Sequence, residues 1–281
     1  MVDVVERRKR SQDKSSGWGE TIRTVVYAVL IALVVRTFVV EPFNIPSGSM
    51  IPTLLVGDYL FVSKFSYGYS RHSFPFSLGL FPGRILGQMP ERGDVAVFKY
   101  PGDQGQGANR TDYIKRIVGL PGDHMQVTNG VLIINGKPTE RSFIGEYTGG
   151  AGFYQKGKLY KETLPNGRSY TVLEYSDNGM SDNTPEFVVP PESFFVMGDN
   201  RDDSLDSRTH LLKRDGLGMP ANRDELGWYV PFENLVGRAE FIFFSADPAV
   251  AGWTEPWKWP GAIRFGRFFM AIHGARPSRI P

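Results

Sequence analysis

An apolar stretch near the N-terminus, from Ile22 to Val40, constrains this chain more than any other feature. As an α-helix its nineteen residues are about 28 Å long, close to the roughly 30 Å hydrocarbon core of a bilayer. Arg23 and Arg36 lie near the two ends, where long cationic side chains can reach the polar interface. The stretch therefore predicts one transmembrane helix, 22–40, preceded by a polar segment, 1–21.

Two other interpretations of this stretch are open. A cleaved signal peptide would be followed by a small-x-small cleavage site, but residues 41–46 read Glu-Pro-Phe-Asn-Ile-Pro. A buried core helix is compatible with the uninterrupted apolar run, which extends only from Val25 to Val35. An uncleaved anchor accounts best for the length and the basic residues before it. The positive charges that place the N-terminus in the cytoplasm, and everything after Val40 outside, are Arg7, Arg8, Lys9, Arg10 and Lys14.

Charge and composition exclude several classes of function. The net charge of +2 gives no reason to expect nucleic-acid binding. The chain has no cysteine, so it has no disulfide, thiolate nucleophile or zinc-thiolate site. The histidines have no metal-ligand spacing, and we expect neither a metal nor a cofactor; they are His72, His124, His210 and His273. None of these features indicates an oligomeric state.

Beyond the anchor the sequence predicts mainly β structure. Glycine (32 residues) and proline (20 residues) are frequent and spread along the chain, as in a protein with many turns and short strands. The stretch 131–134 leads into Asn135-Gly136, a hairpin-turn signal, and 137–185 is polar and glycine-rich, as a peripheral insertion would be. The segments rich in β-branched and aromatic residues are 58–64, 94–100, 112–118, 125–134, 187–189, 193–197 and 236–244.

The C-terminal stretch 253–281 interleaves aromatic and cationic residues. This pattern suits a membrane interface, but a stretch that packs on the domain surface fits equally well. The residues concerned are Trp253, Trp257, Trp259, Phe265, Phe268 and Phe269 beside Lys258, Arg264, Arg267, Arg276 and Arg279.

The first candidate for chemistry is the pair of serines Ser47 and Ser49, in a turn-rich segment just past the anchor. A serine hydroxyl is a poor nucleophile unless a base removes its proton. No histidine forms a partner pattern here, and no G-x-S-x-G motif is present. Ser-Gly-Ser alone is more often a turn than a site, so another base is needed to give it meaning.

Lys115 is the candidate base. It is adjacent to Arg116 in a strand-like run, so the two side chains point to opposite faces. If Arg116 faces water, Lys115 faces inward, and burial lowers the pKa of a lysine from about 10.4 towards neutrality. A pKa of ~8 corresponds to about 3 kcal/mol against the charged form, and the neutral amine can then take a proton from serine. An exposed lysine on an irregular strand is the alternative.

A third segment, 197–208, places many hydrogen-bonding side chains after an apolar strand, which predicts a tightly bonded loop at the edge of a site. A cation-binding loop is the rival interpretation, but Arg201 and Arg208 offset much of the acidic charge and EF-hand spacing is absent. A separate stretch, 152–158, satisfies most of a phosphate-loop pattern. It is rejected because Leu159 stands where a magnesium-binding serine or threonine belongs.

Together, in this order after an anchor, the three segments resemble the bacterial type I signal peptidases, also called leader peptidases. The similarity covers 41–64, 92–123 and 193–245, including Arg92-Gly-Asp-Val-Ala-Val-Phe-Lys-Tyr-Pro and Asn234-Leu-Val-Gly-Arg-Ala. The resemblance implies a membrane-bound serine endopeptidase that cleaves N-terminal signal peptides from exported preproteins after a small-x-small motif. It also implies a single-pass protein of the bacterial inner membrane with its catalytic domain on the outer face.

The resemblance further implies the role of each site residue. Ser49 matches the nucleophile and Lys115 its general base. The Ser47 hydroxyl and the Ser49 N–H match the oxyanion hole, and Ser204 matches the serine that hydrogen-bonds the lysine amine. Asp206 and Arg208 match an ion pair that supports the loop, and Asp199 matches a residue near that pair. The shallow pockets for small side chains match Phe43, Ile45 and Ile114.

The fold that the resemblance implies is mainly β: an antiparallel β-sheet catalytic core, 41–123 and 187–252, with a smaller β cap inserted at 124–186. This chain departs from some relatives in having one spanning segment and an insertion at 209–226. A Ser/Lys hydrolase of related fold with another substrate, such as a self-cleaving repressor, would lack the anchor. A non-catalytic anchored β module would have no reason to keep Ser47, Ser49, Lys115 and Ser204 together.

Overall fold

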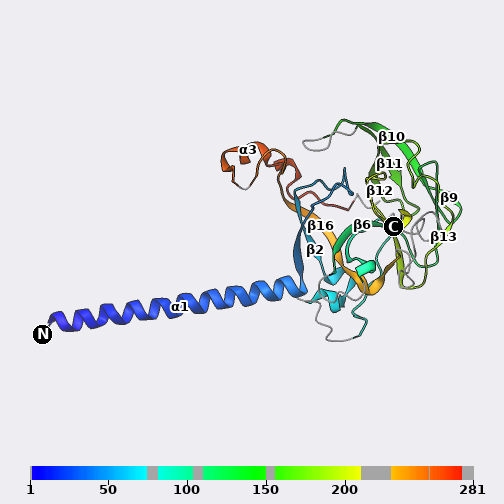
Figure 1. The fold of residues 1–281 in the computed structure, drawn as a ribbon. Coiled ribbons are helices and arrows are strands. Elements are labelled where there is room, and N and C mark those ends of the chain that lie inside the picture. Colours follow the sequence, from blue (N-terminus) through cyan, green and yellow to red (C-terminus); the bar gives the residue numbers. More distant parts are fainter. Residues whose placement is uncertain are drawn as a thin grey trace, which may run out of the picture.

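A long N-terminal helix leads into a β domain (Figure 1). The computed structural model describes residues 2–74, 82–103, 110–149, 156–209, 229–252 and 254–273. Helix α1 (Val2–Phe38) contains a segment long and apolar enough to cross a membrane, Trp18–Phe38, with a mean hydropathy of 1.8 and none of its window buried in the protein. A core helix would be buried, so that interpretation of the apolar stretch is wrong.

Helix α1 ends two residues before the predicted end of the anchor. The helix stops at Phe38, and Val40 already belongs to strand β1 (Val40–Asn44), where it pairs with Ser63 of β2 (Asp58–Ser63). Pro42 has no N–H and disfavours helical backbone in the residue before it, so the chain becomes extended here although it is still apolar.

One antiparallel sheet of seven strands forms the centre of the domain, which confirms the mainly β prediction. Each segment predicted as a strand in 58–64, 94–100, 112–118, 193–197 and 236–244 lies in this sheet. In spatial order the strands are β1, β2, β16 (Leu235–Ser245), β5 (Val95–Lys99), β6 (Asp112–Gly119), β14 (Ser193–Met197) and β15 (Val230–Pro231).

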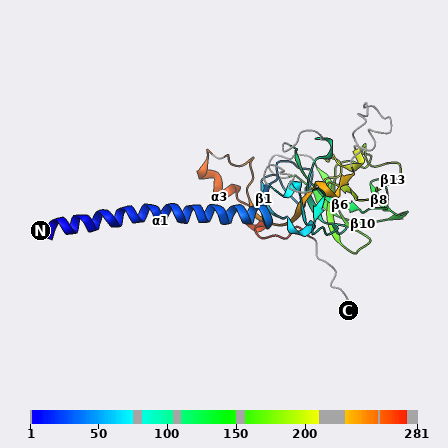
Figure 2. The ribbon, with the colours of Figure 1, turned by 90° about the horizontal axis from the view of Figure 1, so that it is seen from below.

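The strands between residues 124 and 188 form two smaller sheets at the end of the domain farthest from α1 (Figures 1 and 2). The predicted peripheral insertion 137–185 is therefore itself largely β. One sheet orders β13 (Phe187–Val188), β7 (His124–Thr128), β8 (Val131–Ile134) and β9 (Lys137–Pro138); the other orders β10 (Glu140–Tyr147), β11 (Gly157–Thr163) and β12 (Ser169–Glu174). The division into core and cap stays a prediction, because one hydrophobic cluster joins Val118 and Phe195 of the large sheet to Met125 and Val127 of β7.

Two Asn-Gly turns shape this region, and only one was predicted. The expected turn at Asn135-Gly136 joins β8 to β9, with φ angles of 52° and 73°. The stretch 125–134, predicted as one strand, is broken at Asn129-Gly130, where φ is 49° and 75°. Asparagine and glycine tolerate the left-handed backbone that a two-residue hairpin requires, so the same signal occurs twice within ten residues.

The remaining described elements are short. Strands β3 (Tyr69–Ser70) and β4 (Arg84–Ile85) pair with each other. The one-turn 3-10 helices are η1 (Phe65–Tyr67), η2 (Arg71–Ser73), η4 (Pro101–Asp103), η6 (Phe232–Asn234), η7 (Pro256–Lys258) and η8 (Phe265–Arg267), and α3 (Trp259–Ala262) is a short α-helix. Most of the predicted insertion 209–226 and of the rejected loop 152–158 lies outside the described residues.

The C-terminal segment 254–273 packs on the domain and also exposes aromatic rings. Ile272 is buried in a core cluster, and Arg267 forms an ion pair of 2.6 Å with buried Asp58. In contrast, Phe265 and Phe269 are 65% and 77% exposed. The segment around α3 projects toward the side on which α1 joins the domain (Figure 1). Residues 254–273 of the predicted C-terminal stretch thus pack on the domain, while binding to lipid stays a prediction. Trp253, Arg276 and Arg279 lie outside the described residues.

Candidate active site

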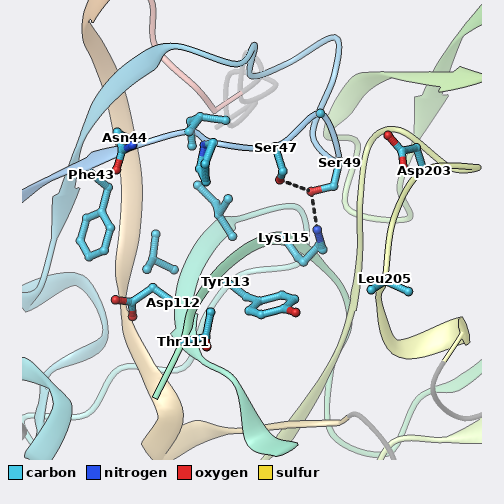
Figure 3. Close-up of a pocket in the computed structure, with 15 residues that line it drawn as sticks. Phe43, Asn44, Ser47, Ser49, Thr111, Asp112, Tyr113, Lys115, Asp203 and Leu205 are labelled. Carbon is cyan, nitrogen blue, oxygen red and sulfur yellow. Dashed lines mark hydrogen bonds between the residues drawn. The ribbon is translucent and has the colours of Figure 1, made fainter. Parts of the chain in front are cut away.

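The segment that carries the two serines is a compact turn pinned by apolar side chains. Met50 and Leu54 are fully buried in a cluster with strands β2, β5 and β16. The Ile51 N–H donates to the Gly48 carbonyl at 3.1 Å and the Leu54 N–H to the Met50 carbonyl at 2.9 Å. This turn fixes Ser49, which is 9% exposed, at the wall of a groove (Figure 3).

Lys115 reaches the Ser49 hydroxyl from the neighbouring sheet. It lies in the middle of β6, in register with Ala96 of β5. Its Nζ lies 2.5 Å from Ser49 Oγ, although the two residues are 66 positions apart. Ser47 Oγ lies 3.5 Å from Ser49 Oγ on the other side (Figure 3). The structure therefore brings together the predicted nucleophile, base and oxyanion donor.

The surroundings of Lys115 favour a neutral amine. The residue is 3% exposed, and no carboxylate among the described residues forms an ion pair with it. Burial lowers the pKa of Lys115 to about 8, and the charges of Asp206 and Asp199 oppose this shift only in part. A substantial fraction of the amine is then neutral near pH 8 and can accept a proton from Ser49 across the same contact.

The premise that Arg116 faces water is wrong. Arg116 is 2% exposed and lies on the opposite face of β6, where its Nε and Nη2 donate to Asp199 at 2.8 and 2.6 Å. Its guanidinium also lies 4.1 Å from the centre of the Tyr170 ring on β12. Strand alternation was applied correctly, but the small sheets cover the face that was expected to meet solvent.

The loop 198–208 is tightly bonded, as its polar sequence predicts. Asp206 accepts hydrogen bonds from the Arg208 guanidinium at 2.8 and 3.0 Å and from the Gly198 N–H at 3.0 Å. Burial alone would raise the pKa of Asp206, but Arg208 and these bonds hold it below the ordinary value. The expected Asp206–Arg208 pair is present, whereas Asp199 supports the site by pairing with Arg116 instead.

The hydrogen bond expected between Ser204 and the Lys115 amine is not formed. Ser204 is 9% exposed, and no hydrogen bond joins its Oγ to the Lys115 amine; the Ser204 hydroxyl instead helps to lower the pKa of Asp206. The Lys115 amine is directed to Ser49 instead. Ser204 is nevertheless next to the site, because a Cβ on Gly198 would lie 2.3 Å from Ser204 Oγ and 2.4 Å from the Ser49 carbonyl oxygen.

Two residues of this loop that the sequence interpretation did not single out hold the nucleophile segment. Gly198 is required by the close approach just described, since any side chain there would displace Ser49 or Ser204. Asn200 donates from its backbone to the Ser49 carbonyl and from its side chain to the Gly48 carbonyl, both at 3.1 Å. A glycine and an asparagine after a strand indicate only a turn, so the sequence signal could not assign these roles.

A groove of about 520 Å³ runs past the two reactive side chains. The three predicted pocket residues, Phe43, Ile45 and Ile114, all line it. Phe43 lies to one side of the Ser49–Lys115 contact (Figure 3). Ile45 is buried and the other two are half-buried, so this part of the groove is shallow and apolar. No group of three or more histidine or carboxylate side chains placed to hold a metal is found in the described ranges.

Comparison with known proteins is consistent with this site. The chain matches the model of a family described as signal peptidase, peptidase S26, over residues 18–244. It is 42% identical over 227 residues to the signal peptidase I of Rickettsia typhi, covering 78% of this chain and 77% of that protein. It is 41% identical over 272 residues to the signal peptidase I of Rickettsia conorii, covering 91% and 92%.

Among solved structures, the chain is similar to a signal peptidase I from Enterococcus faecalis V583. The two are 21% identical, and the match covers 54% of this chain and 97% of the other with a TM-score of 0.28. The fold assignment rests on the strand pairings described above and not on this low TM-score.

Proposed function

The chain belongs to the signal peptidase family, peptidase S26, and from this premise we propose that it removes signal peptides from preproteins with Ser49 as nucleophile and Lys115 as general base. The observation that carries the proposal is the 2.5 Å contact between Lys115 Nζ and Ser49 Oγ. Both residues lie inside the matched range 18–244, and no histidine takes part in the contact.

The reaction is an acyl transfer. Neutral Lys115 accepts the proton of the Ser49 hydroxyl, and Oγ attacks the carbonyl carbon that precedes the scissile bond. The Ser47 hydroxyl and the Ser49 N–H stabilise the oxyanion. The Lys115 ammonium then gives its proton to the departing amine of the mature protein. Neutral Lys115 finally deprotonates a water that hydrolyses the ester, which restores Ser49 and releases the signal peptide with a free carboxylate.

The groove suits an extended peptide with small side chains. Its walls are the edge strand β1 and the start of β6, so a substrate segment can lie between them and form main-chain hydrogen bonds. The walls at Phe43, Ile45 and Ile114 leave shallow apolar spaces rather than deep pockets. These spaces fit the small residues that precede a signal-peptide cleavage site.

The membrane arrangement is part of the proposal. Helix α1 spans the bilayer once, the basic segment before it stays in the cytoplasm, and the catalytic domain lies on the outer face of the bacterial inner membrane. The exposed rings of segment 254–273 then lie at the lipid interface. Residues 40–49 reach at most about 30 Å, so Ser49 stays near the surface at which a signal peptide emerges.

The catalytic assignment is tested with the purified full chain in lipid and a preprotein that carries an Ala-x-Ala site. We expect Ser49→Ala to abolish cleavage and Ser47→Ala to lower kcat by about 10²–10³-fold. Ser142→Ala changes an exposed serine on β10 and should leave the rate unchanged. Mass spectrometry of the products locates the cut. Cleavage by Ser49→Ala at the normal rate would rule out the proposed nucleophile.

The orientation is tested separately, because the chain has no native cysteine. Ser142→Cys places a single thiol on exposed β10. We expect a membrane-impermeant maleimide to label it in spheroplasts without lysis. Labelling only after lysis would place the catalytic domain in the cytoplasm and contradict the proposed topology.

A further inference from the structure

The groove continues past Ser49 and Lys115 to a second end, lined by Asp203 and Leu205. In Figure 3 these two side chains lie on the opposite side of the Ser49–Lys115 contact from Phe43. Both belong to the loop 198–208, and both are exposed, Leu205 by 52%. This end is therefore open to a bound chain. The other carboxylate in the groove lining, Asp112, lies on the Phe43 side and is paired with Lys99 at 2.9 Å (Figure 3).

The position of this end follows from the direction of an extended substrate. Residues before the scissile bond fill the apolar end at Phe43 and Ile114, and the carbonyl under attack lies at Ser49. An extended chain advances about 3.3 Å per residue, so the next residue passes Ser49 and reaches the opposite end. Resting on the function proposed above, we propose that Asp203 and Leu205 form the subsite for the first residue of the mature protein, and that Asp203 selects against an acidic side chain there.

Asp203 differs from the other carboxylates of the loop in having no structural role within it. Asp199 is bound to Arg116 and Asp206 to Arg208, and Asp202 accepts from the Tyr175 and Ser176 N–H groups at 2.7 and 2.9 Å. Asp203 has no hydrogen bond or ion pair to any described residue. Three carboxylates thus hold the loop together, while the fourth lines the groove and is available to a ligand.

Electrostatics supports the placement of Asp203 beside the reaction. Burial lowers the pKa of Lys115, and Asp203 is among the carboxylates whose charge opposes that shift. Among the described residues, the one positively charged side chain that lines the groove is Lys115, which is neutral when it acts as the base. An acidic first residue therefore meets repulsion that nothing in the groove lining compensates, whereas a lysine meets attraction. Leu205 adds an apolar surface for the methylene groups of such a side chain.

The test uses three preproteins that are identical except for lysine, glutamine or glutamate as the first mature residue. Attraction and repulsion by one exposed carboxylate are each worth about twofold, so we expect kcat/KM to be about fourfold higher for lysine than for glutamate, with glutamine between them. The ratio should shrink as salt is raised, because the pair is exposed to solvent.

Two variants assign the preference to Asp203. In Asp203→Asn the lysine-to-glutamate ratio should fall to about one, and in Asp203→Lys it should reverse. Glu140→Gln removes a charge from an exposed position on β10, outside the groove, and should keep the ratio of about fourfold. Each ratio compares substrates on the same enzyme preparation. Partial misfolding of a variant lowers kcat/KM equally for all substrates and leaves the ratio unchanged.

The outcomes separate this inference from the proposed function. If the native chain cleaves none of the three preproteins, the proposed function fails. If it cleaves all three at equal rates, or if Asp203→Asn keeps the preference, the subsite assignment is overturned while the function stands. Leu205→Ala gives a second readout, an expected loss of about threefold for a first residue of leucine relative to alanine.

Discussion

The two faces of strand β6 bury two neighbouring cations and use them in different ways. Lys115 and Arg116 are 3% and 2% exposed. Among the described residues the Lys115 amine contacts the Ser49 hydroxyl and the Tyr113 ring but no carboxylate, and burial lowers its pKa to about 8. Arg116 meets Asp199, and although burial alone would lower the pKa of Arg116, the carboxylate raises it. A buried cation with a partner keeps its charge, whereas one without a partner approaches neutrality.

The Arg116–Asp199 pair on one face of β6 also helps to position the groups around Lys115 on the other face. Asp199 accepts a hydrogen bond of 2.5 Å from Thr53 Oγ1, four residues after the nucleophile. The adjacent Asn200 binds the Gly48 and Ser49 carbonyls, and its own backbone bridges to Leu173 of β12. The ion pair on one face therefore anchors the loop and the turn that place Ser49 against Lys115 on the other.

The largest effect should come from changing the charge behaviour of Lys115. Both Lys115→Met and Lys115→Arg should lose about 10⁴-fold in kcat/KM, since methionine cannot accept a proton and the arginine guanidinium stays protonated. Preprotein cleavage in lipid measures the loss, with circular dichroism as the control for folding. Activity of Lys115→Arg within tenfold of the native chain would mean that a neutral lysine is not the base.

The second test breaks the pair on the opposite face. Arg116→Met leaves Asp199 charged and buried without its partner, which should lower the free energy of unfolding by about 3–5 kcal/mol. Denaturant unfolding in detergent, followed by tryptophan fluorescence, measures the change. The double variant with Asp199→Asn removes the stranded charge and should recover part of the loss. An Arg116→Met protein as stable as the native chain would contradict a structural role for the pair.

In the third test, a substitution on the Lys115 face should raise the free energy of unfolding, whereas Arg116→Met lowers it. The fall of the pKa from 10.5 to about 8 corresponds to about 3 kcal/mol of destabilisation below pH 8, of which the lost Ser49 hydrogen bond offsets about 1 kcal/mol. Lys115→Met should therefore raise the free energy of unfolding at pH 7 by about 2 kcal/mol. Denaturant unfolding, which should show lower stability for Arg116→Met, should show this higher stability for Lys115→Met. Lower stability in both variants would contradict the difference between the two cations.

The sign of the pH dependence follows from the lowered pKa. Between about pH 8 and 10.5 the unfolded chain binds the Lys115 proton and the folded chain does not, so native stability should rise through that window and the rise should be absent in Lys115→Met. Unfolding curves at pH 7, 9 and 10 measure it. Parallel pH dependence in both proteins would mean that Lys115 is charged in the folded state.

The last test concerns rate against pH. The reactive form is the neutral amine, so kcat/KM should rise about tenfold per pH unit below the Lys115 pKa and level off above about 8. Steady-state cleavage from pH 5 to 9 measures this, and tryptophan fluorescence at each pH controls for folding. A flat profile would contradict a lysine base.

The sequence predicts the parts of this fold that depend on neighbouring residues. The anchor, the main strands and the Asn135-Gly136 turn follow from composition, alternation and turn chemistry, and the large-sheet strands lie where they were expected. Predictions failed where long-range packing decides the outcome. The condition that Arg116 faces water does not hold. Gly198 and Asn200 carry no sequence signal of their roles, and the hydrogen bond expected from Ser204 to the Lys115 amine is not formed.

Alternation along β6 was enough to state that Lys115 and Arg116 face opposite ways, because side-chain direction in a strand is a local property of the backbone. Which of the two side chains becomes reactive is not determined by neighbouring residues in the sequence. It depends on Ser49, 66 residues away from Lys115, and on Asp199, 83 residues away from Arg116. Only tertiary packing brings these groups together, and the resulting loss of solvent and choice of partner determine which buried cation is held neutral enough to act as a base.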